Sequence, residues 1–190
     1  EENNKDVADN KDVLENVVEN SLPEIAEPEE VEKISYYDEF GKEHKVEKKK
    51  WVEKKLNPGI KENWNNVEAL YPIVLDAFSK EAYSEVQEAC FRIYSLDKNK
   101  ERKTNILGTY YIKTDAYDQA IEMYKKYLSS EVASESIYVN YATALEGADR
   151  TWEAESIYLR ALKLNPNSVE AFRNYFKLIR RKGTKEYIKQ

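Results

Sequence analysis

Residues 107–124, LGTYYIKTDAYDQAIEMY, decide the fold of this 190-residue chain. Leu107, Gly108 and Tyr111 are spaced so that they lie on one face of a helix. Tyr117, Ala120 and Tyr124 define the face of a second helix in the same way. The stretch therefore predicts a pair of helices joined by a short turn.

The pattern repeats with a period of 34 residues and without insertions from Val67 onward, which predicts an array of stacked helix pairs. The units are 67–100, 101–134, 135–168 and a partial unit, 169–190. Unit positions 8 and 20 carry small residues, which favour close approach of the two helices within each inner pair. These residues are Gly108 with Ala120 and Ala142 with Ala154. First-helix positions 4, 7, 8 and 11 form the expected core, and in the last unit they are Phe172, Tyr175, Phe176 and Ile179.

Residues 107–124 and the run A-x-x-x-Y-x-x-A-L-x-L-N-P at 154–166 resemble the tetratricopeptide repeat (TPR), a 34-residue helix–turn–helix unit. The resemblance covers 124 residues and implies an all-α fold, a right-handed α-solenoid of about 3.5 helix hairpins. The first unit departs from the pattern, because Lys98 replaces the repeat-ending proline and Pro72 interrupts the first helix. We expect that helix to kink or to begin late.

Two segments precede the repeats. Residues 1–33 carry twelve acidic residues against three lysines, a composition that predicts a disordered acidic leader. Residues 34–66 predict a small cap, with a β-hairpin in ISYYDEFGKEHKV and a helix around Trp51 that ends at Asn57-Pro58-Gly59. The YYDEFG run, with Trp51 and Trp64, also resembles the leader of some bacterial TPR proteins.

The TPR resemblance implies that the first helices line a concave groove that binds a protein or peptide. In part of the family, Lys and Asn at groove positions 5 and 9 of one repeat clamp a peptide carboxylate. This pair is absent here, but amides and cations at other groove positions favour an acidic peptide. The alternative for the cations is a solvated helix face. The predicted peptide-binding residues are Arg102, Asn105, Thr109, Asn140, Thr143, Arg173, Asn174, Lys177 and Arg180.

Composition argues against other classes of function. One histidine and one cysteine, His44 and Cys90, provide neither a metal site nor a nucleophile with its base, so we expect no enzyme, metal or cofactor. No apolar run is long enough to span a membrane, and the net charge of −6 opposes nucleic-acid binding. We expect a cytoplasmic scaffold. The alternative is a homo-oligomer that assembles through the C-terminal half-repeat, using Phe176, Tyr187 and Ile188.

Overall fold

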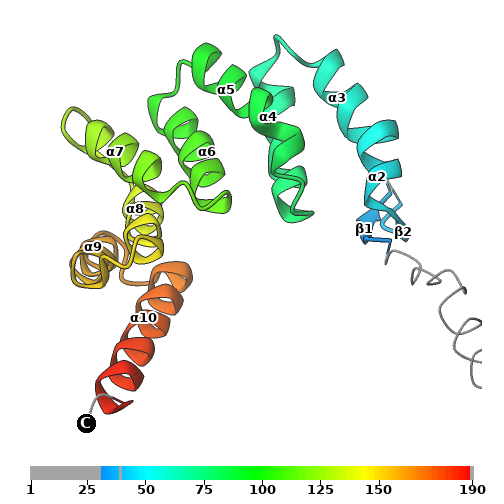
Figure 1. Ribbon diagram of the computed structural model, residues 1–190. Helices are drawn as coiled ribbons and strands as arrows, with labels where there is room; N and C mark the ends of the chain where they lie inside the picture. The colour runs from blue at the N-terminus through cyan, green and yellow to red at the C-terminus, as the bar shows by residue number, and fades with distance from the viewer. Residues whose placement is uncertain (1–30, 39, 189–190) are drawn as a thin grey trace, which may run out of the picture. The chain divides into compact units, whose positions relative to one another are not determined.

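The computed structural model describes residues 31–38 and 40–188, with side chains to residue 183 (Figure 1). The predicted disorder of the acidic leader falls almost wholly on residues outside this range. The chain divides into two units, 1–33 and 34–190, and the second contains the repeats.

The N-terminal part is a β-hairpin followed by a helix with an irregular turn. Strands β1 (Lys33–Tyr37) and β2 (Glu43–Glu47) pair in a two-stranded sheet. In their connection Gly41 has a φ of 76°, and the Asp38 carboxylate accepts backbone hydrogen bonds from Phe40 and Lys42. This confirms the predicted hairpin. Helix α2 (Lys48–Trp51), the π-helical turn η1 (Val52–Leu56) and α3 (Asn57–Glu62) then follow without a break.

The prediction that Asn57-Pro58-Gly59 ends this helix is wrong. Pro58 lies in the first turn of α3, directly after the π-helical turn. In a regular α-helix a proline clashes with the carbonyl four residues earlier, whereas a π-helical turn shifts the hydrogen-bond register and accommodates the defect. The helix consequently continues to Glu62.

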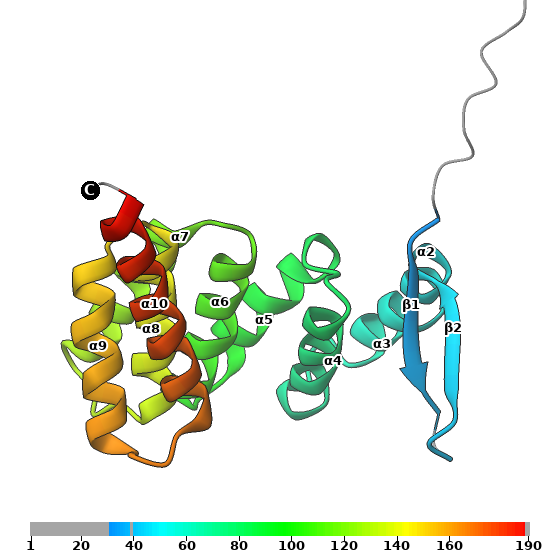
Figure 2. The same cartoon turned by 90° about the horizontal axis from the view of Figure 1, so that it is seen from below.

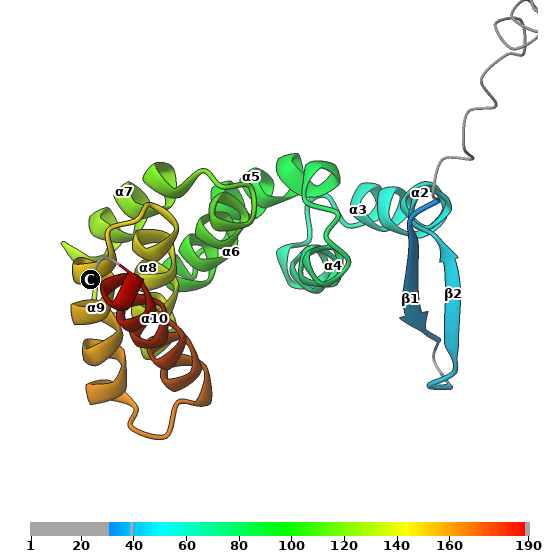
Figure 3. The same cartoon turned by 60° about the horizontal axis from the view of Figure 1, so that its bottom comes forward.

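Three helix pairs and one further helix follow in chain order (Figure 1). Each helix packs on the next, and α8 also contacts α6 and α10, as expected for a helical-repeat array. Views in two directions show α8, α9 and α10 side by side (Figures 2 and 3). The first pair is α4 (Val67–Ser79) with η2 (Ser84–Val86) and α5 (Gln87–Leu96); the second is α6 (Lys100–Lys113) with α7 (Tyr117–Leu128); the third is α8 (Glu135–Gly147) with α9 (Thr151–Leu164); α10 is Val169–Ile188.

The turn inside each pair repeats the 34-residue period in its backbone. Glu81, Asp115 and Asp149 have φ values of 56°, 57° and 56°, in the left-handed region. After each of them a backbone N–H bonds back to a carbonyl five residues earlier, for example Ala116 N to Tyr111 O at 2.8 Å. This closes the first helix in the manner of a Schellman motif, with an acidic residue where glycine is usual.

The buried side chains follow the predicted register in the three helix pairs. In α10 the prediction is wrong for Phe172 and Phe176, which are exposed because no second helix of the described chain covers them. Second-helix positions 20, 24 and 27 are buried in all three pairs. A Cβ built on Gly108 would lie 2.3 Å from the Tyr124 hydroxyl oxygen, so the small residue makes room for an aromatic ring rather than only for a neighbouring backbone. The residues buried around α4, α5 and α6 form one core and those around α7 to α10 a second, and Tyr111 packs against both.

Pro72 does not delay the first helix of the array. Helix α4 begins at Val67, where the Asn66 side chain accepts a hydrogen bond from Ala69 N and caps the helix. Pro72 itself is exposed, so the interrupted part of the helix faces solvent.

Candidate functional site

Polar side chains on the first helices are joined to one another across neighbouring repeats. The Asn105 side chain of α6 donates to Ser136 Oγ at 3.1 Å, and Asn140 of α8 donates to Asn105 Oδ1 at 3.0 Å. Two predicted site residues, Asn105 and Asn140, therefore come together and bridge α6 and α8. The amide pair leaves the Asn140 oxygen as an acceptor at this surface.

Arg102 lies at the start of α6, where it links two repeats. Its guanidinium donates to Glu68 at 2.8 and 2.6 Å and to Asp97 at 2.5 and 3.1 Å, and it lies over the Tyr71 ring. Burial opposes ionisation of Asp97, but the hydrogen bonds from Arg102 and from Asn99 N outweigh it and lower the pKa of this carboxyl group. The two carboxylates raise the pKa of Arg102. The geometry gives Arg102 a structural role, because its donors are already engaged.

Thr109 and Thr143 occupy equivalent positions on α6 and α8, beside the tyrosines of the following helices. Burial raises the pKa of Tyr124, and the neighbouring Thr109 and Asn140 side chains oppose this shift. Thr143 Oγ1 donates to the Val139 carbonyl and lies 3.1 Å from the Tyr158 hydroxyl. Both threonines thus border the first-helix surface next to a buried tyrosine.

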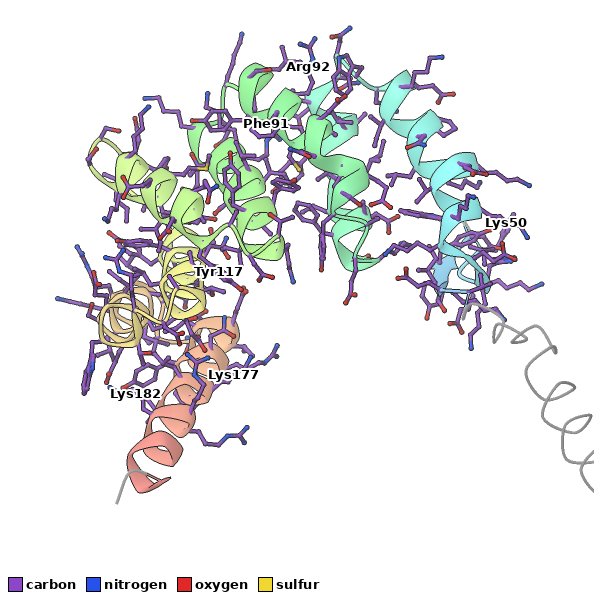
Figure 4. All side chains as sticks on the ribbon, viewed as in Figure 1. Lys50, Phe91, Arg92, Tyr117, Lys177 and Lys182 are labelled. Atoms are coloured by element: carbon purple, nitrogen blue, oxygen red, sulfur yellow. The ribbon has the colours of Figure 1, made fainter. Side chains whose placement is uncertain are left out.

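The region between α8 and α10 contains a small recess, here called the inner cavity, with a volume of about 200 Å³. It brings together two predicted residues of α10, Asn174 and Lys177, with Thr143 of α8. Lys177 and Lys182 lie on different sides of α10, and Lys182 pairs with Glu155 of α9 (Figure 4). The residues that line the inner cavity are Ile112, Tyr117, Thr143, Glu146, Gly147, Tyr158, Asn174, Lys177 and Arg181.

Arg181 adds a second cation to the inner cavity. Its Nη1 lies 3.3 Å from Glu146 Oε1, and Glu146 also accepts from the Tyr158 hydroxyl at 3.2 Å. Among the described residues Arg181 Nη2 has no hydrogen-bond partner, although 40% of the Arg181 side chain is exposed. A carboxylate in this recess would lie beside two cations, Lys177 and Arg181, which favour it through charge-assisted hydrogen bonds. Arg181 is not among the predicted peptide-binding residues, because the spacing alone does not indicate its contact with Glu146.

The remaining predicted residues lie on a second surface of α10. Arg173, Lys177 and Arg180 flank an apolar recess of about 730 Å³, whose floor contains Phe172 and Phe176. We call this the outer stripe; it comprises Phe172, Phe176 and Ile179 with Arg173, Lys177 and Arg180. Only Lys177 borders both the outer stripe and the inner cavity. The predicted groove residues consequently divide between two surfaces.

The histidine and the cysteine have ordinary structural surroundings. His44 Nε2 lies 2.7 Å from Asp38 Oδ2 and its ring stacks on Tyr36, while burial raises the pKa of the Cys90 thiol to about 12. No group of three or more metal-ligating side chains occurs among the described residues. Within the same part of the chain, no helix is both long and apolar enough to cross a membrane.

Solved structures with a similar fold include two that are described as TPR proteins. The first TPR domain of human RPAP3 aligns with a TM-score of 0.56 at 18% identity, covering 65% of this chain and 98% of that domain. MamA from Desulfovibrio magneticus RS-1 aligns with a TM-score of 0.53 at 16% identity, covering 67% and 72%. YrrB, described as a TPR protein with an unusual peptide-binding site, aligns with a TM-score of 0.50 at 18% identity, covering 69% and 68%.

No family model and no curated protein sequence matches the chain. The structural similarities establish the fold, a TPR-like helical solenoid with a small N-terminal β-hairpin.

Proposed function

We propose that this protein is a non-enzymatic scaffold that binds an acidic peptide segment of another protein on its first helices. A carboxylate of the peptide enters the inner cavity. The observation that carries this proposal is the recess that brings Lys177, Asn174 and Arg181 together, with one positive charge in excess of the Arg181–Glu146 ion pair. TPR neighbours supply a precedent, because YrrB is described as having a peptide-binding site.

The chemistry of the inner cavity suits one carboxylate better than a larger anion. Lys177 contributes a charge, Asn174 an amide and Arg181 a guanidinium N–H. Glu146 occupies the other side of Arg181, so the cavity has one positive charge in excess of that ion pair. Charge-assisted hydrogen bonds to a carboxylate contribute about 1.5–3 kcal/mol each, enough for tenfold selectivity or more over an amide.

The test is a fluorescence-polarisation screen of labelled peptides rich in Asp and Glu against the full chain. We expect binders whose affinity falls at least tenfold when their carboxylates are replaced by amides, and falls similarly in Lys177→Glu and Asn174→Ala. Lys126→Glu is the matched control, since Lys126 is exposed and lies on α7, in an earlier repeat than α10. Equal affinities for acidic and amide peptides, or no effect of either α10 variant, would overturn the proposal.

Self-assembly through the C-terminal half-repeat is the second candidate, favoured by the exposure of Phe176. The side chains of Tyr187 and Ile188, its other expected contributors, lie outside the described residues. Light scattering over a range of concentrations distinguishes the two candidates. A dimer that Phe176→Asp dissociates supports assembly, and a monomer at every concentration contradicts it.

A further inference from the structure

Within the described part of the chain, helix α10 packs on one side only. It buries Ala171 and Leu178, with Tyr175 half-buried between them, against α8 and α9. The adjacent apolar positions point away from this contact: Phe172 is 53% exposed and Phe176 is 57% exposed. Their rings lie 4.7 Å apart and form a continuous aromatic surface.

The same unit positions are covered in the preceding repeats. Thr104 and Tyr138, which correspond to Phe172, are buried and half-buried, and Gly108 and Ala142, which correspond to Phe176, are both buried. Their own second helices, α7 and α9, pack against α6 and α8. The outer stripe is thus the surface on which a second helix would lie, and it carries two large aromatic side chains where terminal helices of repeat arrays are usually polar.

The aromatic residues also limit how closely a second helix can approach α10. At position 8 of the second unit, a Cβ on Gly108 would already be 2.3 Å from the Tyr124 hydroxyl. Phe176 occupies that position in α10, so a second helix cannot approach as closely as α7 approaches α6. The outer stripe therefore fits a helix that packs at a larger distance, as helices do at interfaces between proteins.

Charge defines the chemistry of that helix. Arg173 and Lys177 follow the two phenylalanines by one residue each, so a cationic pair lies beside the apolar row over one turn. A complementary helix needs an apolar row with carboxylates beside it.

We propose that the outer stripe binds an amphipathic helix of another protein, with apolar side chains on Phe172 and Phe176 and carboxylates beside Arg173. An antiparallel second copy of α10 is disfavoured, because it would bring its own cations to the same edge. This interaction does not depend on peptide binding in the inner cavity, and the two are separable because Phe172 and Arg173 line only the outer stripe.

The experiment uses three synthetic alanine-based helical peptides of about 16 residues, a length at which such helices begin to form in water. The first carries leucines at i, i+4 and i+7 with glutamates on both flanks. The second has lysines in place of the glutamates, and the third has the composition of the first with its leucines scattered around the helix. Binding to the full chain is measured by fluorescence polarisation.

We expect the first peptide to bind at least tenfold more tightly than the other two. Phe172→Ser and Phe176→Ser should each weaken it at least fivefold, and Arg173→Glu should reverse the preference toward the lysine peptide. Leu159→Ser on α9 and Lys126→Glu on α7 are the matched controls, since both side chains are exposed, and thermal unfolding verifies that all variants fold.

Three outcomes would overturn the proposal. Equal binding of the glutamate and lysine peptides would show that the outer stripe is a non-specific apolar patch. Failure of the first peptide to bind would show that the outer stripe is only solvated. Dimerisation of the free chain that Phe172→Ser abolishes would identify a second copy as the occupant.

Discussion

Replacing Gly108 by alanine tests the packing inside the second repeat. The new methyl carbon would lie 2.3 Å from the Tyr124 hydroxyl oxygen, 2.5 Å from Cζ and 2.9 Å from Cε2. All three distances are shorter than a van der Waals contact. The Tyr124 side chain has no exposed surface, so its ring cannot swing into solvent to relieve the clash.

The expected magnitude follows from two opposing effects. Overpacking a closed core costs about 1–3 kcal/mol, and the enclosed ring places this site near the upper end. Alanine gains up to about 1 kcal/mol over glycine inside a helix. We therefore expect Gly108→Ala to lower the free energy of unfolding by about 2 kcal/mol, which corresponds to a fall in Tm of roughly 4–8 °C for a domain of this size.

Gly183→Ala is the matched control, because Gly183 also lies inside a helix but its Cβ would meet no atom within 4 Å. It should be neutral or stabilising by up to about 1 kcal/mol. Urea unfolding followed by circular dichroism measures both variants. No described residue meets hydrogen-bond geometry with the buried Tyr124 hydroxyl, although Thr109 and Asn140 neighbour it, so Tyr124→Phe should cost little alone and recover part of the loss in Gly108→Ala. If Gly108→Ala is as stable as Gly183→Ala, the packing argument is refuted.

Three further predictions concern single sites. Glu81→Gly should raise the free energy of unfolding by about 0.5 kcal/mol, because φ is 56° there; a loss in urea unfolding would contradict this. Arg102→Met should destabilise at neutral pH by about 2–3 kcal/mol, since Asp97 would be buried without its cation. The pKa of Asp97 is lowered in the wild type and would be raised in this variant. The loss in free energy of unfolding relative to the wild type should therefore shrink as the pH falls through the raised pKa. A loss that stays constant from pH 7 to 4 would contradict this prediction. Burial raises the pKa of Cys90 to about 12, so the thiol of the native protein should resist iodoacetamide at pH 8. The free energy of unfolding should decline as the pH rises above about 9, because the thiol of the unfolded chain ionises first. Rapid alkylation of the native protein would contradict this prediction by showing that Cys90 is accessible.

The repeat register could be predicted from sequence because it depends on periodic burial. A 34-residue recurrence of apolar and small residues places the helix pairs, and the structure confirms that Val86, Cys90 and Ile93 are buried at the positions equivalent to those in later repeats. The role of Gly108 in packing was predicted only in part. The periodicity indicated a close approach between the two helices of the pair, whereas the contact itself is with the Tyr124 ring.

Sequence reasoning failed where the local rule for one residue is changed by its neighbours. Asn57-Pro58-Gly59 is typical of a helix end, but the π-helical turn before Pro58 allows the helix to continue. The left-handed turns at Asp115 and Asp149 also escaped notice, because acidic residues rarely adopt this conformation and give no glycine signal.

The candidate site was predicted in its helix faces but not in its contacts. Spacing places Arg102 and Lys177 on first helices, yet it cannot show that Arg102 is engaged by Glu68 and Asp97. It also cannot show that Arg181 of α10 pairs with Glu146 of α8, since both contacts depend on the positions of residues from different repeats.

Zero-length cross-linking tests the central claim most directly, which is that a peptide carboxylate enters the inner cavity beside Lys177. An acidic peptide from the polarisation screen is activated at its carboxylates, incubated with the full chain, and the modified lysines are mapped by mass spectrometry. We predict that Lys177 is the principal site, that an excess of unactivated peptide suppresses its modification, and that Phe172→Ser, which alters only the outer stripe, leaves the modification unchanged. Coupling spread over exposed lysines such as Lys126, with no excess at Lys177, would contradict the account.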